Sequence, residues 1–310
     1  MSDFPLVSII IPVYNGSNYL GEALDSALAQ TYQNVEILVI NDGSTDNGAT
    51  REIALRYGDK IRYYEKENGG VATALNLGIR EMKGAYFSWL SHDDVYYPEK
   101  ISAQIALKNK LPDNTIFYTN IEYINKKSRH LSFYIMDSNY LNSKPSYSIL
   151  RGSIHGCSLL IPKSAFNECG VFDENLKTTQ DYDLWFKMRL KYKFVHQPRV
   201  LIKSRIHKNQ GSNNNSIVLK ECNELWMNFI NQITLAEIIQ YEKNANLYYA
   251  KLGIFLMKTP YKEAASYCFT KVKHKQFYKV LQKILWGFEM IGNKYRNMIY
   301  SVKKHLPETV

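Results

Sequence analysis

Two neighbouring carboxylates are the residues of this chain most suited to chemistry. Asp93 and Asp94 follow an apolar run within Ser88–Tyr97, which reads SWLSHDDVYY. Adjacent carboxylates repel each other, so a strand end that carries both is unfavourable without a cation. Oxygen ligands suit Mg²⁺ or Mn²⁺, and these ions usually complete their shell with substrate phosphates. The pair therefore predicts a divalent metal site, and an Asp-Asp turn without a ligand is the alternative.

Alternating strands and helices over the first hundred residues must position this pair. Apolar runs predict strands at 7–13, 35–40, 61–65 and 85–90, and helical patterns fill the intervals between them. This alternation specifies an α/β fold with a mostly parallel central sheet flanked by helices. Ligands bind beyond the carboxyl ends of such strands. The polar residues predicted at these ends are Asn15, Asp42, the turn Asn68-Gly69-Gly70, and Asp93 with Asp94.

The remainder of the chain is less regular. The pattern predicts strands at 115–124, 157–161, 194–195 and 200–206, helices at 163–169 and 182–191, and a long loop over 126–156. After the polar link 209–216, the sequence is helical from residue 217 and predicts a helical hairpin over 244–271, with an apolar stripe at 277–291.

Composition excludes several classes of protein. The 310 residues are 45% hydrophobic and 22% charged, which is ordinary for a globular protein. The opening Met-Ser-Asp-Phe-Pro predicts no signal peptide, and no apolar stretch approaches the roughly 20 residues of a membrane span. The four cysteines form no C-x-x-C pair, so we expect neither a zinc site nor a redox motif. Reduced thiols in a cytoplasmic protein are the expected state of these cysteines.

Five blocks of sequence occur in a recognisable order. They are VSIIIPVYN, QTYQNVEILVINDGSTD, NGGVATALNLGI, WLSHDDVYYP and GVFDENLKTTQDYDLWFKMRL. Together they resemble the successive motifs of family 2 glycosyltransferases with the GT-A fold, over roughly residues 5–210. The resemblance implies a sugar-nucleotide donor, a divalent cation and inversion at the anomeric carbon. We therefore expect a catalytic domain over 1–215, with a nucleotide-binding half to about residue 100 and an acceptor-binding half after it. The resemblance does not cover the tail, where the residue pattern predicts a basic helical extension over 216–310.

The resemblance assigns the donor to the sheet edge. Asp42 is expected to accept a hydrogen bond from uracil, and its alternative role is an Asx turn or helix cap. The glycines of the turn 68–70 allow close approach of a ligand to a helix N-terminus, although a plain turn has the same residues. Tyr14 is expected to stack on the base or simply to pack. The full set expected to bind the UDP-sugar is Pro12, Tyr14, Asn15, Asp42, Asn68, Gly70, Asn76 and Asp93.

The metal and the catalytic base are assigned in the same way. Asp93, Asp94 and His207 are expected to hold Mn²⁺ or Mg²⁺, with Ser91 standing where the family has a further carboxylate. A structural role is the alternative for His207. Asp181 is expected to act as the base that removes the proton of the acceptor hydroxyl. Either Asp181 or Asp183 could instead cap the following helix.

The basic charge is concentrated near the C-terminus. Residues 251–310 contain twelve Lys/Arg and three Glu, and so carry nine of the ten net positive charges. An anionic membrane surface is one expected partner of this segment, and packing on the catalytic domain or on a second subunit is the other. The expectation is therefore a metal-dependent inverting enzyme of cell-surface polysaccharide synthesis, peripheral on the inner face of the membrane, with a saccharide or lipid-linked saccharide acceptor.

One alternative belongs to another functional class. A non-catalytic saccharide- or nucleic-acid-binding protein with a basic helical tail would also explain the pI of 9.2. Nucleic acid is not expected, because the basic surplus lies apart from the acidic sheet edge. A homo-oligomer is left open by the sequence.

Overall fold

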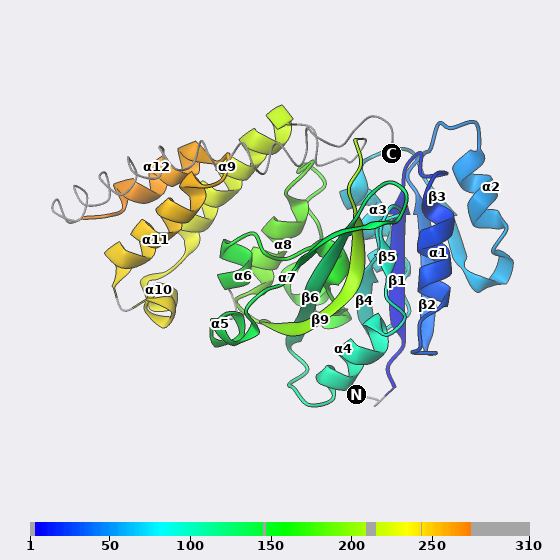
Figure 1. The fold of residues 1–310 in the computed structure, drawn as a ribbon, viewed down its shortest axis with the longest axis horizontal. Coiled ribbons are helices and arrows are strands. Elements are labelled where there is room, and N and C mark those ends of the chain that lie inside the picture. The colour runs from blue at the N-terminus through cyan, green and yellow to red at the C-terminus, as the bar shows by residue number, and fades with distance from the viewer. Residues whose placement is uncertain (1–3, 145–146, 209–214, 243, 274–310) are drawn as a thin grey trace. The chain divides into compact units, whose positions relative to one another are not determined.

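The computed structural model describes residues 4–144, 147–208, 215–242 and 244–273 (Figure 1). Contacts divide the chain into two compact units, 1–221 and 222–310. Among the described helices, none combines the length and the apolar character needed to cross a bilayer. The domain boundary expected at 215/216 stays a prediction. The apolar stripe at 277–291 lies outside the described residues.

A five-stranded sheet with the order β3-β2-β1-β4-β8 is the centre of the first unit (Figure 1). Its strands are β1 (Val7–Val13), β2 (Val35–Asn41), β3 (Arg62–Glu65), β4 (Tyr86–Trp89) and β8 (Ile161–Pro162). The first four are parallel, and β8 pairs antiparallel with β4. All of β1 is buried, as expected for a strand covered on both faces. The predicted α/β fold with a mostly parallel sheet is confirmed.

Helices α1 (Leu20–Leu28), α2 (Ala49–Leu55) and α3 (Val71–Glu81) connect these strands, with a short 3₁₀ turn η1 (Gly58–Lys60) after α2. The chain crosses from β1 to β2 to β3 and then returns to β4. Right-handed crossovers therefore place α3 on the face of the sheet opposite to α1 and α2. Gly78 lets α3 approach the sheet, since a Cβ there would lie 2.5 Å from Cγ2 of Ile10.

A second sheet with the order β5-β9-β6-β7 completes the first unit. It consists of β5 (Val95–Tyr96), β9 (Lys193–Arg205), β6 (Thr115–Ile124) and β7 (His130–Tyr134), and α4 (Lys100–Lys108) follows β5. The prediction of two separate strands at 194–195 and 200–206 was wrong, because β9 is continuous. Its register against β6 jumps from Gln197 to Val200, so Pro198 lies in an irregularity where its missing N–H costs no ladder bond.

Two other expectations were also wrong. The expected loop over 126–156 contains β7, α5 (Ser138–Ser143) and α6 (Tyr147–Leu150). All residues of β7 are exposed, so burial imposes no alternating pattern on its sequence. The expected strand at 157–161 begins in the 3₁₀ turn η2 (Gly156–Ser158). Leu160 then forms an isolated bridge with Phe117, and Ile161 pairs with β4. Helices α7 (Lys163–Cys169) and α8 (Gln180–Met188) confirm the two predicted helices, and Gly170 ends α7 with φ +90°.

Within the described part of the C-terminal extension, the helices are α9 (Asn215–Gln232), α10 (Leu235–Tyr241), α11 (Ala245–Met257) and α12 (Lys262–Thr270). These residues confirm the helical character of the extension. The predicted hairpin corresponds to α11 and α12. Ala250, Phe269 and Val272 form an apolar cluster in the second unit. Gly253 makes room for this packing, since a Cβ there would lie 2.5 Å from the ring of Phe269.

Candidate active site

The loops that leave β1 and β2 are tied together by Asn15. Its side-chain Oδ1 accepts a hydrogen bond from Thr45 N at 2.7 Å, and its own backbone N–H donates to Ser44 Oγ at 2.9 Å. Asn15 has φ 48°, a left-handed conformation that Asn tolerates better than most residues. Tyr14 beside it is 45% exposed, whereas Pro12 is buried within β1. The edge thus presents Tyr14 to a ligand and keeps Pro12 in the sheet.

Asp42 is the centre of the neighbouring turn. Its carboxylate is 3% exposed and accepts hydrogen bonds from Lys66 Nζ at 2.6 Å, Gly70 N at 2.7 Å and Gly69 N at 3.1 Å. Asn68 Nδ2 donates to the Asp42 carbonyl at 2.9 Å. The structure therefore brings Asp42, Asn68 and Gly70 together. Since donors of the chain already occupy both carboxylate oxygens, contact with a nucleobase would use a remaining lone pair.

Asp93 and His207 meet at this edge although they are 114 residues apart in sequence. Asp93 Oδ2 lies 2.9 Å from His207 Nε2, and the side chains are 13% and 12% exposed. Burial opposes ionisation of Asp93, but the hydrogen bond from His207 and the nearby His92 bring its pKa below the ordinary value. The pair is an ionised carboxylate and an imidazole at the carboxyl end of β4.

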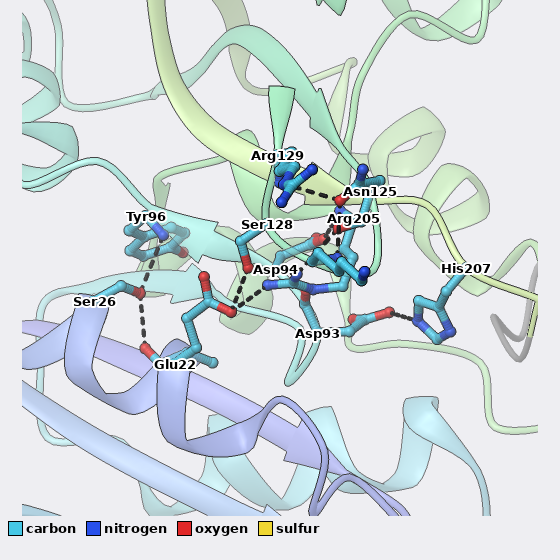
Figure 2. Close-up of polar contacts among 12 residues, drawn as sticks. Glu22, Ser26, Asp93, Asp94, Tyr96, Asn125, Ser128, Arg129, Arg205 and His207 are labelled. Atoms are coloured by element: carbon cyan, nitrogen blue, oxygen red, sulfur yellow. Dashed lines mark hydrogen bonds and ion pairs between the residues drawn. The ribbon is translucent and has the colours of Figure 1, made fainter. Parts of the chain in front are cut away.

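Asp94 points in a different direction from Asp93 (Figure 2). Its Oδ1 accepts a hydrogen bond from Arg205 N at 2.9 Å, and Oδ2 lies 3.8 Å from His155 Nε2. Burial, followed by the charge of Asp93, raises the pKa of Asp94 to about 8. The structure therefore brings Asp93 and His207 together but turns the carboxylate of Asp94 toward the backbone of β9.

The surroundings of Asp94 include three side chains with the spacing of a possible ligand set, and hydrogen bonds hold His155 and Cys157 in place. Side-chain atoms of Asp94, His155 and Cys157 lie within 4.8 Å of one another. His155 Nδ1 accepts a hydrogen bond from Cys157 N at 3.2 Å, so in the neutral ring Nε2 carries the proton. That proton is directed to Ser204 Oγ at 3.1 Å. Burial lowers the pKa of His155 to about 4, which keeps the ring neutral. The three groups therefore form a hydrogen-bonded cluster.

Arg205 is a site residue that the sequence reasoning missed. Its guanidinium is fully buried and donates to Glu22 Oε2 at 2.6 Å, Ser128 Oγ at 2.8 Å, the Asp93 carbonyl at 2.8 Å and the Asn125 carbonyl at 3.2 Å (Figure 2). It therefore joins α1, the turn after β6 and the segment that carries Asp93. Arg205 is the last residue of β9, and its hydrogen-bond partners lie far away in sequence, so its own neighbours gave no signal of this role.

Asp181 and Asp183 lie in the first turn of α8, whose N-cap is Thr179. Asp183 forms an ion pair with Lys187 at 2.6 Å, one turn along the helix. Asp181 Oδ1 instead accepts a hydrogen bond from Tyr182 N at 2.7 Å, and burial raises its pKa to about 6. A carboxylate whose pKa is raised to about 6 suits proton transfer near neutral pH.

Asn76 has a different environment from the other predicted donor residues. It is 3% exposed, donates to the Phe172 carbonyl and to Glu174 Oε1, both at 2.9 Å, and accepts a bond from Phe172 N at 3.0 Å. These bonds fasten α3 to the segment before α8. Its expected place near the donor stays a prediction.

Comparison with known proteins identifies the family to which these ordered motifs belong. Residues 8–170 match the sequence model of the Glycosyl transferase family 2. This chain belongs to that family. A protein of Rickettsia bellii described as an uncharacterized glycosyltransferase is 54% identical over 265 residues, which cover 84% of this chain and 38% of the relative. The chain spans 38–50% of the length of three such rickettsial relatives, and 92% of two others.

Solved structures share the GT-A fold. The Staphylococcus aureus protein TarS 1–349 in complex with UDP-GlcNAc superposes with a TM-score of 0.61 at 15% identity, covering 91% of this chain and 92% of TarS 1–349. The mannosyltransferase PcManGT of Pyrobaculum calidifontis in complex with GDP-Man and Mn²⁺ gives a TM-score of 0.58 at 16% identity, covering 99% and 88%. Because the sequence identities are only 15% and 16%, these two comparisons establish the fold of the chain and nothing further.

The residues at the sheet edge fit a divalent cation. Two neighbouring ligands of an octahedral ion with bonds of about 2.1 Å lie about 3 Å apart, and Asp93 Oδ2 and His207 Nε2 are 2.9 Å apart. Carboxylate oxygen and imidazole nitrogen are ligands that suit Mn²⁺ and related ions. Asp93 and His207 are therefore a suitable pair of ligands if an ion replaces their hydrogen bond, and the expected ligation by Asp94, whose Oδ1 accepts a bond from Arg205 N, stays a prediction.

Proposed function

We propose that this protein is a metal-dependent inverting glycosyltransferase that moves a sugar from a UDP-sugar to a saccharide or lipid-linked saccharide acceptor. The observation that carries the proposal is the meeting of Asp93 and His207 at the edge where β1, β2 and β4 end. A hexosyl or N-acetylhexosaminyl group is the proposed cargo. The proposed setting is synthesis of a cell-surface polysaccharide (capsule, O-antigen or lipooligosaccharide) on the inner face of the cell membrane.

In this proposal the nucleotide lies across the ends of β1 and β2. Asp42 receives the base, Tyr14 stacks on it, and Asn15 fixes the loop against which the ribose rests. The diphosphate would lie near the N-terminus of α3, where the helix end favours negative charge, while the N–H groups of Gly69 and Gly70 stay bonded to Asp42. Asp93 and His207 would hold Mn²⁺ or Mg²⁺ beside the same diphosphate. When bound, the ion would act as a Lewis acid that stabilises the charge on the departing UDP.

Asp181 is the proposed general base. Inversion requires a group on the acceptor side that removes the hydroxyl proton while the oxygen attacks the anomeric carbon. A carboxylate with a pKa near 6 is ionised at neutral pH and still basic enough to take that proton. The nearby Asp183 instead forms an ion pair with Lys187, and we therefore do not propose it as the base.

The test measures UDP release from a panel of sugar nucleotides with and without Mn²⁺, using wild type and two matched variants. Wild type should release UDP from one donor class and only with the metal. Asp181→Asn should lower transfer by about 10²–10⁴-fold and leave UDP binding near normal. Asp183→Asn, which makes the same change two residues away, should retain most activity. Metal-independent release, or loss of UDP binding in Asp181→Asn with residual transfer, would contradict the proposal.

A further inference from the structure

The β6–β7 hairpin presents an exposed apolar strand at the edge of the second sheet. β7 is the last strand in the order β5-β9-β6-β7, and every residue of it is exposed. Leu131, Phe133 and Ile135 are 39%, 55% and 62% exposed. Phe133 pairs with Glu122 of β6, Leu131 lies where the register of the two strands shifts, and Ile135 directly follows the end of β7, so the three residues follow one another along this hairpin arm. Three large apolar side chains along one free edge need a reason other than the core of this unit.

The turn of the same hairpin is cationic. Lys126, Lys127 and Arg129 are exposed, and in the described ranges no ion pair involves their side chains. The turn is nevertheless ordered, because Asn125 Oδ1 accepts hydrogen bonds from Lys127 N at 2.8 Å and Arg129 N at 3.1 Å. Glu122, the acidic residue on β6, is buried and bonded to His130 and Tyr97, so it does not neutralise the turn.

We infer that these six residues, which we call the hairpin patch (Lys126, Lys127, Arg129, Leu131, Phe133 and Ile135), dock on an anionic phospholipid surface. Lipid headgroups complement the three cations, and the acyl boundary receives the apolar side chains. Two copies of the chain meeting here would bring six cations together and repel. Nucleic acid would gain little from Leu131 and Ile135, since aliphatic side chains offer no ring for base stacking.

Docking through the hairpin patch would also fix the orientation of the candidate active site relative to the lipid surface. Arg205 donates to Asn125 O and Ser128 Oγ in the hairpin turn, and to the Asp93 carbonyl (Figure 2). One buried side chain therefore fixes the hairpin to the segment that carries Asp93. A lipid-linked acceptor would then be held near the metal edge. This consequence rests on the proposed function, whereas the docking itself does not.

Co-sedimentation of the full chain with vesicles tests the inference. Wild type should bind vesicles of phosphatidylcholine mixed with phosphatidylglycerol and should bind phosphatidylcholine alone at least tenfold more weakly. K126E/K127E/R129E should reduce binding to the mixed vesicles by tenfold or more. The control K60E/K83E/K110E makes the same change of charge at exposed lysines on other elements and should bind like wild type. Phe133→Ser with Ile135→Ser should also reduce binding, without any change of charge.

A second measurement locates the contact directly. Phe133→Trp should gain fluorescence that lipids with brominated acyl chains quench. Absence of quenching, absence of wild-type binding, or equal losses in the two charge triples would overturn the inference. So would a dimer, detected by light scattering, that Phe133→Ser dissociates. Metal-dependent UDP release is measured on the same variants. It should be unchanged in all of them, so failure of docking and failure of the proposed chemistry are distinguished.

Discussion

Burial of Asp181 sets the pH at which it can act. Its pKa is raised to about 6, so the carboxylate is ionised above that pH and protonated below it. The rate of transfer at saturating donor should therefore fall as the pH drops through about 6 and level off above it. In Asp181→Asn the low residual rate should lose this limb, whereas Asp183→Asn should keep it. A limb near pH 6 that persists in Asp181→Asn would assign the titration to another group.

Asp93 and Asp94 are adjacent in sequence, but their contacts predict different consequences of mutation. Replacing His207 by Ala should raise the Mn²⁺ concentration for half-maximal activity by about tenfold or more, because one of the proposed protein ligands is lost. Asp94→Asn should leave that concentration within a few-fold of wild type, since an amide oxygen can still accept the bond from Arg205 N. A metal titration of UDP release decides between the two roles. An equal shift in both variants would restore Asp94 as a ligand.

At the scale of elements, Arg205 joins α1, the β6–β7 turn and the segment after β4. Arg205→Met should leave Glu22 without its partner and the carbonyl oxygens of Asp93 and Asn125 without their donor. Because the Glu22 side chain is 42% exposed and can regain water, the cost comes mainly from the two carbonyl oxygens, at about 1–3 kcal/mol in the free energy of unfolding for each one left unpaired. Urea denaturation measures the loss. The double variant with Glu22→Gln should lose less than the sum of the single changes, because the two residues interact. Strict additivity would contradict the coupling.

The same elements show how far sequence reasoning reaches. Strands β1, β2 and β4 are predictable because their burial gives apolar runs, whereas β3 reads RYYE and is only partly buried. Asn15, Asp42 and Asp93 are predictable because the ends of parallel strands share one edge. β7 is not predictable in this way, because no face of it is buried. Arg205 is not predictable from its own neighbours, because its partners lie 77 to 183 residues away. The direction of Asp94 depends on the backbone of β9, which the motif does not encode.

At the scale of the whole molecule, the described site residues all lie in 1–221, while 222–310 forms a separate compact unit. A ligand stabilises only the unit that binds it, by about 2.7 kcal/mol when present at 100 times its dissociation constant. Calorimetry of the full chain should therefore resolve two transitions, and UDP with Mn²⁺ should raise one of them by about 5 °C or more. His207→Ala should remove most of the metal-dependent part of that shift and leave the other transition unchanged. Helix α9 runs through the boundary at 221/222 and could couple the two units into a single transition. Either a single transition or an equal shift of both transitions would contradict the assignment of ligand binding to the first unit alone.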